Sequence, residues 1–543
     1  MKRPNVLILF SDQQRFDTVN AAGFHHMLTP NLDRLANSGC IYMNAHSSNP
    51  VCMPARHDML TGLPARAHGY YGNNHKNPIK DYGIPTLPRI FSENGYRTVA
   101  VGKMHFSPPR MHHGFSEMFL MEEILAVRQD DQYACYLEQE GLGHIQNLHG
   151  VRPHIYHIPQ NAQTDEKHHG TTWVADKAID WLKTNNGHPF FMMCGWIQPH
   201  PPWNIPTEFD GIYSGKDIPE PIPMSRDYPD TKEGSVWHGD HDSQIHKRKI
   251  RESYYTAVTM VDKHVGRILD YLEESNQLDN TLIIFTSDHG EMLQDKGYYS
   301  KELPYEGAVR IPFIVRYPEK FGSGKICNSF VDLLDVMPTC LDVCGLKYKD
   351  TKYELPGESL CTVASCKDRR CQVSSTGFLG ERRWVMSRND RYKYVYYYNQ
   401  GTEEFYDMKK DPGEIVNLLK TGEYPYEVYK ELQTRAIEYE KEWGPEGAVQ
   451  NDEFIKIDGK QFHGSVCGKF HYWSNSQMQY YDERTEEERG HRLIEEMEHA
   501  LSNFEKSKVS LNEVFNDEAW KKDFINKFHE FGVCEGFEKK IFK

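Results

Sequence analysis

The chain lacks an apolar stretch long enough to cross a bilayer, which takes about 18 residues or more. It also lacks an excess of basic residues: 63 lysines and arginines stand against 78 acidic residues, a formal net charge of -15. Internal repeats and low-complexity tracts are missing as well. These absences argue against a membrane-spanning protein, a repeat protein and a nucleic-acid binder with a basic face. We therefore expect neither a membrane nor a nucleic acid among the partners.

Cysteine is scarce and irregularly spaced, with 12 residues in the chain and no Cys-x-x-Cys pair. Cys361, Cys366 and Cys371 lack nearby histidines at the spacing of a zinc site. The apolar run near the N-terminus stops after Phe10, and the small-residue cleavage site of a signal peptide does not follow it. Reduced thiols in a cytosolic protein fit this pattern, so we expect a cytoplasmic location.

Short apolar runs alternate with amphipathic helical patterns, which is typical of a largely parallel sheet covered by helices on both faces. The predicted strands are 6–10, 98–101, 190–194 and 281–286, and the predicted helices are 31–38, 172–183 and 251–275. A chain of 543 residues is too long for one small domain. The pattern predicts a large α/β domain with an appendage.

The C-terminal part has a different pattern. Between 380 and 406 apolar residues alternate as in antiparallel strands, and 427–443 has a helical pattern. Beyond Gly444 the chain is polar and rich in aromatic residues, with a further helical pattern at 485–504. We predict three units, namely an α/β domain over residues 1–375, an antiparallel-sheet subdomain with a helix over 376–445, and an extension over 446–543. The extension either covers the pocket or mediates homo-oligomer formation.

Polar side chains follow four of the predicted strands directly. Asp12, Lys103, His200 and Asp288 each lie just past the C-terminal end of an apolar run. In open α/β sheets the ligand crevice forms at that edge, so we expect these four side chains to meet. An acidic protein that acts on an anion needs such a local cationic pocket.

Cys52 begins the most informative motif. Residues 52–56 read Cys-Met-Pro-Ala-Arg, and residues 60–62 read Leu-Thr-Gly. A cysteine taken alone is more often a packing residue. The whole stretch, however, resembles the sequence that type I sulfatases present for oxidation of their cysteine to formylglycine. The resemblance implies that a formylglycine-generating enzyme converts Cys52 to an aldehyde. The hydrated aldehyde carries one hydroxyl that attacks sulfur and a second that expels the sulfate afterwards.

The resemblance covers residues 4 to about 443 and includes further motifs in the family's order. It implies the alkaline-phosphatase-like α/β fold, a mixed sheet flanked by helices and followed by a small antiparallel-sheet subdomain, to which this chain adds a helical extension. It also implies a sulfatase that hydrolyses sulfate esters by S–O cleavage.

The resemblance implies a divalent cation as well. The metal ligands that it indicates are Asp12, Gln13, Cys52, Asp288 and His289. Many sulfatases carry a second aspartate where this chain has Gln13, whose amide oxygen can bind a hard cation but brings no charge. We therefore expect Ca²⁺, with Mn²⁺ or Mg²⁺ as open alternatives. Without a metal, Asp12 and Gln13 would serve as a cap at the end of the strand.

The remaining site residues that the resemblance implies are the catalytic Arg56, Lys103, His105, His200 and Lys301 and the substrate-binding Asn74. Arg56 follows Cys52 by one helical turn, so its guanidinium can reach back if a helix starts there. The cationic side chains would offset charge developing on sulfate. His200 or Lys301 would assist the departing alkoxide.

Two alternatives stay open. Asp12-Gln13 also occurs in phosphonate monoester hydrolases and choline sulfatases, so a phosphonate monoester or phosphodiester hydrolase with the same nucleophile is the other enzymatic hypothesis. A sulfated-glycan binder with an unmodified Cys52 is the non-enzymatic one. We expect the substrate to be a small-molecule or oligosaccharide sulfate ester, whose leaving group is read by loops such as 120–165.

Overall fold

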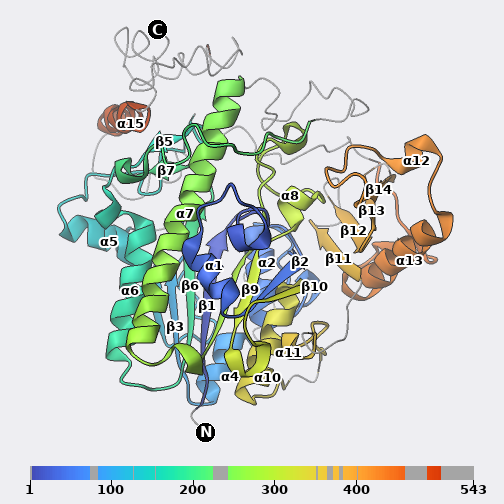
Figure 1. Cartoon of the computed structure of the whole chain (residues 1–543), viewed down its shortest axis with the longest axis horizontal. Coiled ribbons are helices and arrows are strands. Elements are labelled where there is room, and N and C mark those ends of the chain that lie inside the picture. The colour runs from blue at the N-terminus through green and yellow to red at the C-terminus, as the bar shows by residue number, and fades with distance from the viewer. Residues whose placement is uncertain are drawn as a thin grey trace.

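An eight-stranded sheet forms the centre of the computed structural model (Figure 1). Its strands lie in the order β10 (Lys325–Asp332), β2 (Cys40–His46), β9 (Phe313–Arg316), β8 (Thr281–Ser287), β1 (Asn5–Asp12), β6 (Phe190–Pro199), β3 (Arg97–Gly102) and β4 (Glu117–Leu120). Neighbouring strands are parallel except where β9 pairs with β2 and β8. The predicted strands and the mixed α/β sheet are therefore confirmed.

The structure describes residues 3–502, apart from 74–82, 126–127, 153–154, 224–242, 350–351, 364–370, 378–382, 400 and 459–485, and it also describes Lys522. The longer helices flanking the large sheet are α1 (Pro30–Asn37), α2 (Cys52–Thr61), α4 (Leu87–Glu93), α5 (Gln132–Gln139), α6 (Gly170–Thr184), α7 (Gln244–Glu274) and α10 (Val336–Cys344). Short helices are α3 (Ala65–His68), α8 (Glu306–Val309), α9 (Pro318–Phe321) and α11 (Leu360–Val363).

Alternating side chains of β1 supply both hydrophobic cores, because successive residues of a strand point to opposite faces of the sheet. Val6 and Ile8 pack in the core that contains α2, α4 and α10. Leu7 and Leu9 pack in the core that contains α1, α6 and α7. The sheet is thus covered by helices on both faces, as the continuous apolar runs predicted (Figure 1).

The predicted helices 31–38 and 172–183 correspond to α1 and α6. The predicted helix 251–275 was too short, since α7 begins at Gln244. The reason is local: the side chain of Ser243 accepts a hydrogen bond from the backbone of His246 and caps the helix there.

A second sheet, antiparallel and four-stranded, follows in the chain. It comprises β11 (Cys371–Thr376), β12 (Trp384–Asn389), β13 (Tyr392–Tyr397) and β14 (Thr402–Asp407), with α12 (Leu418–Thr421) and α13 (Tyr426–Trp443) beside it. Leu432 and Ala436 of α13 pack against Val385 and Phe405 of the sheet. The predicted antiparallel subdomain is confirmed, and β11 begins it earlier than residue 376. The division of the chain into three units stays a prediction.

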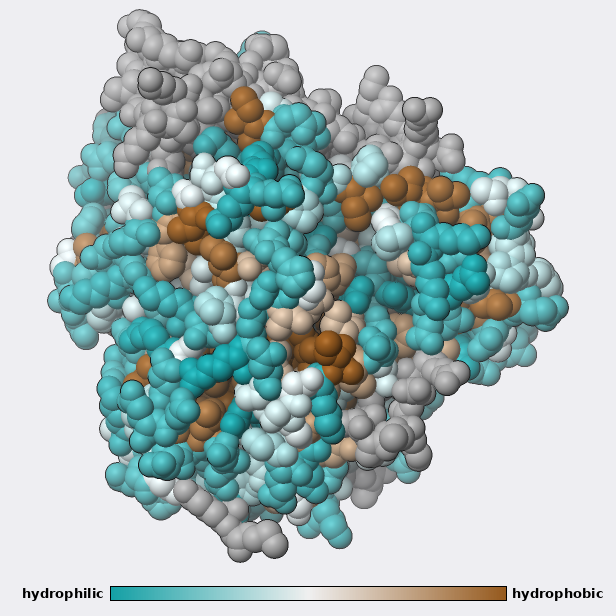
Figure 2. All heavy atoms as spheres, viewed as in Figure 1, coloured by the Kyte–Doolittle hydropathy of each residue, from teal (hydrophilic) through white to brown (hydrophobic). Residues whose placement is uncertain are grey.

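In the described part of the extension, β15 (Val449–Gln450) pairs with β16 (Glu453–Phe454), and α15 (Glu486–Ala500) lies near the short parallel pair β5 (Gln160–Asn161) and β7 (Asn204–Ile205). α15 accounts for most of the helical pattern at 485–504. None of the described helices has the length and apolar character needed to span a membrane. The face shown in Figure 2 is largely hydrophilic, with separated hydrophobic patches.

Candidate active site

The four strands that end in predicted site residues are neighbours in the sheet. β8, β1, β6 and β3 lie side by side and run parallel, so their carboxyl ends share one edge. Asp12 ends β1, and Lys103, His200 and Asp288 follow the other three. The Lys103 ammonium lies 2.6 Å from Oδ2 of Asp12. All four side chains are buried.

Cys52 is the first residue of α2 and is fully buried. Its Sγ lies 3.2 Å from Nε2 of His289 and 3.1 Å from the ammonium of Lys301. The N-terminus of a helix carries a partial positive charge, which favours an anionic or electron-rich group at this position. Two chain segments far from Cys52 in sequence thus place their polar groups on its side chain.

Arg56 lies one turn further along α2, and its guanidinium connects the strand ends. Its Nε donates to Oδ2 of Asp288 at 3.0 Å, and its Nη2 donates to Oδ2 of Asp12 at 2.9 Å. Its Nη1 donates to the carbonyl oxygen of Lys103 at 2.8 Å. The planar fork of arginine suits this bridging role. Arg56 therefore orients the two carboxylates, a role that the sequence did not predict.

Ligand atoms of Asp12, Cys52, Asp288 and His289 lie within 4.8 Å of one another. The Nδ1 of His289 lies 2.9 Å from the carbonyl oxygen of Gly290, which can only accept, so Nδ1 carries a proton and Nε2 faces the cluster, where loss of its own proton would free a lone pair for a cation. Oδ1 of Asp12 is buried and has no hydrogen-bond partner among the described residues. Buried carboxylate oxygens are normally paired. An unpaired one in this cluster fits a cation.

Gln13 lies beside the cluster and has an unusual backbone conformation. Its φ is 66°, in the left-handed region that costs a non-glycine residue of order 1 kcal/mol. Its Nε2 donates to the carboxylate of Glu291, which turns Oε1 towards the ammonium of Lys301, 2.7 Å away. The amide oxygen therefore faces the pocket and is available as a ligand.

The pKa values of the buried acids reflect competing effects. Burial would raise the pKa of Asp12 and of Asp288, yet the nearby cations outweigh it and hold both below the ordinary value. Burial would likewise raise the pKa of the Cys52 thiol. Lys301 and His289 among others outweigh that effect and lower this pKa to about 6. The site is built to stabilise negative charge at Cys52.

Lys301 and His200 form the other wall. Nδ1 of His200 lies 2.6 Å from the carbonyl oxygen of Pro201, so Nε2 accepts from the Lys301 ammonium at 3.0 Å. Burial holds the pKa of His200 well below its usual range. Burial opposes the charge on Lys301, but Cys52 and other anionic groups prevail and raise its pKa. His200 is therefore neutral and Lys301 is the cation.

His105 and Asn74 are less closely tied to the cluster. The backbone N–H of His105, at φ 58°, donates to the carboxylate of Glu122 at 3.1 Å. Asn74 falls outside the described residues. Its neighbour Asn73 accepts a hydrogen bond from the backbone N–H of Met53 at 3.0 Å.

Sequence reasoning missed several polar residues around the site. Glu123 forms ion pairs with Lys103 and Arg152, and Glu291 holds Gln13. Glu123 lies shortly after β4, at the same edge of the sheet as the other strand ends. The rule that polar residues past strand ends gather there would have found it, had 117–120 been identified as a strand. Arg152 gives no comparable signal.

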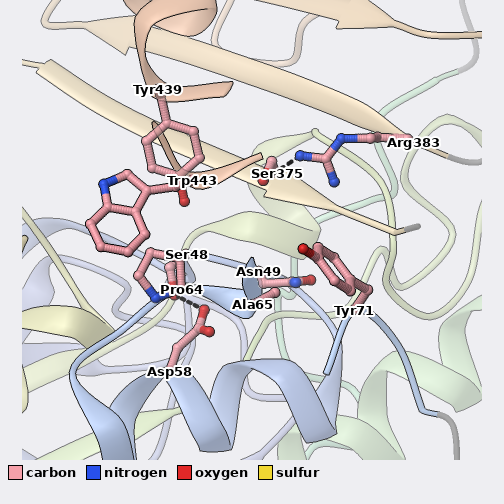
Figure 3. Close-up of a pocket in the computed structure, with 10 residues that line it drawn as sticks. All are labelled: Ser48, Asn49, Asp58, Pro64, Ala65, Tyr71, Ser375, Arg383, Tyr439 and Trp443. Atoms are coloured by element: carbon pink, nitrogen blue, oxygen red, sulfur yellow. Dashed lines mark hydrogen bonds between the residues drawn. The ribbon is translucent and has the colours of Figure 1, made fainter. Parts of the chain in front are cut away.

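A small polar cavity, separate from this cluster, lies between α2 and the small sheet (Figure 3). It is lined by Ser48, Asn49, Asp58, Pro64, Ala65, Tyr71, Ser375, Arg383, Tyr439 and Trp443. In Figure 3, Asp58 points up from α2 and accepts a hydrogen bond from Ser48. On the opposite side, Arg383 donates a hydrogen bond to the hydroxyl of Ser375. None of the predicted site residues that the structure describes lines this cavity.

Comparison with known proteins places these features in a family. A family model described as sulfatase matches residues 4–346, and a model of the C-terminal part of N-sulphoglucosamine sulphohydrolase matches residues 294–442. An arylsulfatase from Clostridium perfringens is 28% identical over 488 residues, which cover 84% of this chain and 98% of that protein.

Two solved structures share the fold. One was solved in complex with its substrate D-glucosamine-2-N,6-O-disulfate. It has a TM-score of 0.65 at 24% identity and covers 83% of this chain and 100% of its own. The other, the phosphonate monoester hydrolase of Agrobacterium radiobacter, has a TM-score of 0.68 at 24% identity and covers 79% of this chain and 94% of its own.

Proposed function

Because the chain belongs to the sulfatase family and is a sulfuric ester hydrolase, we propose that it works through a formylglycine derived from Cys52 together with a divalent cation. The proposed substrate is a sulfate ester of a sugar or another small alcohol, and the proposed cation is Ca²⁺, with Mn²⁺ or Mg²⁺ as alternatives. The observation that carries the proposal is the convergence of Asp12, Asp288 and His289 on the side chain of Cys52.

The residues present fit both groups. The donor set is rich in oxygen, it includes the unpaired Oδ1 of Asp12, and the amide oxygen of Gln13 faces it. When present, the aldehyde supplies the nucleophilic hydroxyl through its hydrate, and the cation offsets negative charge on sulfate. Asp12, Asp288 and His289 would hold the cation, with Gln13 beside them.

The other side chains of the pocket have separate roles in the reaction. Lys103 and Lys301 bring positive charge to the pocket, where sulfate accumulates negative charge in the transition state. Arg56 keeps the carboxylates of Asp12 and Asp288 in place. The proton for the leaving oxygen resides on Nζ of Lys301, which already donates to Nε2 of His200. A leaving oxygen next to His200 would receive that hydrogen bond instead.

A phosphonate monoester hydrolase with the same nucleophile is the second candidate. It is favoured by Gln13 at the metal cluster, and the fold similarity to the phosphonate monoester hydrolase is compatible with it. A sulfated-glycan binder with an unmodified Cys52 is disfavoured by membership of an enzyme family. The cytoplasmic location, the formylglycine-generating enzyme as partner and a homo-oligomer all stay predictions.

The test has two parts. Mass spectrometry of the peptide that contains Cys52, from protein made in its own host, should show the loss of H₂S and the gain of one oxygen. The same protein should then be assayed on sulfated mono- and disaccharides, choline sulfate and phosphonate monoesters. A kcat/KM value that favours the best sulfate ester supports the proposal. A clear preference for phosphonates transfers it to the second candidate.

A further inference from the structure

The pocket contains a carboxylate that binding of sulfate does not require. The side chain of Glu123 is 7% exposed and forms ion pairs with Lys103 and Arg152. Its Oε1 lies 3.5 Å from Nε2 of His200. Since His200 is neutral, this contact is not an ion pair. A carboxylate so close to the proposed sulfate-binding groups opposes the charge of a sulfate ester. Its presence therefore needs a reason other than anion binding.

Arg152 and Tyr156 complete this side of the pocket. Both lie on the segment that leads from α5 to β5. The guanidinium carbon of Arg152 lies 5.1 Å from the centroid of the Tyr156 ring, and that ring meets the ring of His200 edge to face, with 6.3 Å between centroids. The wall beside His200 thus combines an acceptor in Glu123, a fork of donors in Arg152 and an aromatic ring.

This combination matches the chemistry of a sugar. Each hydroxyl both donates and accepts hydrogen bonds, so a carboxylate next to a guanidinium can bind adjacent hydroxyls. The C–H face of the sugar ring is apolar and packs on aromatic rings. Sulfate itself offers only acceptors, so Glu123 has no favourable contact with it.

We propose that Glu123 and Arg152 form a leaving-group subsite that binds hydroxyls of a sugar. The proposal rests on the proposed function, in which His200 and Lys301 face the oxygen that joins sulfate to the sugar. Because the ring is bonded to that oxygen, it must lie on the His200 side of sulfate, where Glu123 and Arg152 are. The substrate class is a sulfated monosaccharide, or the end of a sulfated oligosaccharide, with a free hydroxyl next to the sulfated carbon.

The competing explanation is that Glu123 only orients Lys103. Both explanations use the same contacts, but they differ in how they depend on the substrate. If Glu123 only orients Lys103, its loss weakens catalysis equally for every sulfate ester. If the pair binds hydroxyls, its loss weakens catalysis more for sugar esters than for esters without hydroxyls.

The experiment compares kcat/KM for N-acetylglucosamine 6-sulfate, or the best sulfated monosaccharide of a panel, with kcat/KM for 4-nitrophenyl sulfate. In Arg152→Ala and Glu123→Gln, the ratio of the sugar value to the aryl value should fall by about 10-fold or more, since a polar partner of the sugar is lost. Arg152→Lys keeps the charge but not the fork and should give an intermediate ratio. The control Arg89→Ala, which removes an exposed pair with Glu93, should leave the ratio unchanged. Equal losses on both substrates, or an unchanged ratio, would overturn the subsite.

Failure of the proposed function is separable from failure of the subsite. If the enzyme without substitutions hydrolyses phenyl phosphonate esters and no sulfate ester, the proposed function fails. The subsite is then measured through competitive inhibition of phosphonate hydrolysis by free monosaccharides. The inhibition constant should rise in Arg152→Ala relative to Arg89→Ala. The absence of inhibition by any sugar, or an equal constant in both variants, overturns the subsite independently.

Helix α15 contacts the start of the segment that carries Arg152. Glu496 of α15 is 4% exposed. Its carboxylate accepts hydrogen bonds from the backbone N–H groups of Gln146 at 2.7 Å and of Asn147 at 3.1 Å. The side-chain amide of Asn147 donates to it at 2.7 Å. A buried carboxylate that accepts from three half-buried donors in this way fixes the backbone that carries them.

α15 also holds the end of the same segment. Nε2 of His499 lies 2.8 Å from the carbonyl oxygen of Ala162, and the Gln163 amide donates to the carbonyl oxygen of Glu496 at 3.0 Å. Between the two anchored ends, the Gln160 amide donates to the carbonyl oxygens of Val151 and Ile155, each at 2.8 Å. Arg152 lies in this inner loop.

We infer that α15 is a positioning element that anchors the described residues 146–152 and 160–163, so that Arg152 reaches the pocket. Glu496→Ala should accelerate hydrogen exchange of the Gln146 and Asn147 amides and raise KM for the sulfate ester by about 10-fold, with a smaller change in kcat. The control is Glu495→Ala, whose side chain is 64% exposed and pairs with Arg492.

The exchange measurement does not depend on the reaction or on the sugar subsite. Unchanged exchange in Glu496→Ala would show that the helix does not hold the loop. Faster exchange with an unchanged KM would show that the loop does not need to be held for binding. Either result overturns the inference.

Discussion

Helix α2 carries two buried polar clusters that differ in charge. Its first residue, Cys52, lies among carboxylates whose pKa values are lowered. Further along the same helix, Asp58 bonds Nε2 of His68 at 2.7 Å and the hydroxyl of Ser48. Burial raises the pKa of Asp58 well above its usual value and lowers the pKa of His68 to about 3. The distance alone would suggest an ion pair, but these pKa shifts, and the hydrogen bond that Nδ1 of His68 accepts from the backbone N–H of Tyr70, favour a neutral hydrogen bond.

The difference lies in the neighbouring cations. Arg56, Lys103 and Lys301 offset the cost of burying charge at the Cys52 cluster. Burial and the carboxylate of Asp332 raise the pKa of Asp58, and only the hydrogen bond from Ser48 lowers it. Burial by itself thus neutralises a carboxyl group, and only a surplus of cations keeps it ionised. The ionised cluster is therefore the one organised for chemistry, and four substitutions test this contrast between the two clusters.

Cys52→Ala should have the largest effect. It removes the only source of the proposed aldehyde, so kcat should fall by at least about 10⁴-fold, as when a catalytic nucleophile is lost. Thermal unfolding should remain cooperative, because the small side chain fits the buried position. Turnover by the alanine variant at the rate of the native enzyme would refute the assignment of the nucleophile.

Asp288→Asn should come next, because the cluster would lose one of its carboxylates. We expect weaker metal retention, measured by elemental analysis after dialysis. The rate should fall by about 100-fold or more. Chelation of the native enzyme should abolish activity, and a divalent cation should restore it. A metal-free preparation with full activity would contradict the model.

Lys301→Ala should lower kcat/KM by about 100-fold, since it deletes a cation and the proposed proton donor. The steady-state rate on a sulfate ester is the measurement. Lys320→Ala, at an exposed position of α9, is the control and should behave like the native enzyme. An equal rate for both variants would remove Lys301 from the mechanism.

Asp58→Asn should have the smallest effect, because an amide can replace a protonated carboxyl group. Below pH about 4, where the carboxyl group is protonated in both the folded and the unfolded chain, the free energy of unfolding should change by less than about 1 kcal/mol. The raised pKa also sets a sign. Protonated Asp58 contributes stability below pH about 4, and this contribution is lost as pH rises towards its folded pKa. The variant should therefore gain stability relative to the native protein over that range.

Chemical denaturation at several pH values measures this difference. A loss of several kcal/mol at neutral pH would mean that Asp58 is ionised and paired with His68. The contrast between the two clusters would then disappear.

Much of the fold and part of the site followed from local patterns. Apolar runs identified β1, β3, β6 and β8, and the polar residues after them indicated the edge where the site lies. α7 was too short in the prediction, because its first turns are polar and a serine cap sets its start. The pairing of β9 in the opposite direction leaves no local signal, since strand direction depends on the connection through the folded chain.

The sequence by itself determined the motif at Cys52, the sheet edge and the types of side chain gathered there, because these depend on neighbours within a few positions. Only the tertiary structure decided which charged and polar groups contact one another. The bridge from Arg56 to Asp12 and Asp288, the pairing of Glu123 with Arg152 and the hold of Glu496 on the Gln146 backbone all join distant segments. Burial and the balance of nearby charges set the ionisation of each group, and both exist only in the folded chain.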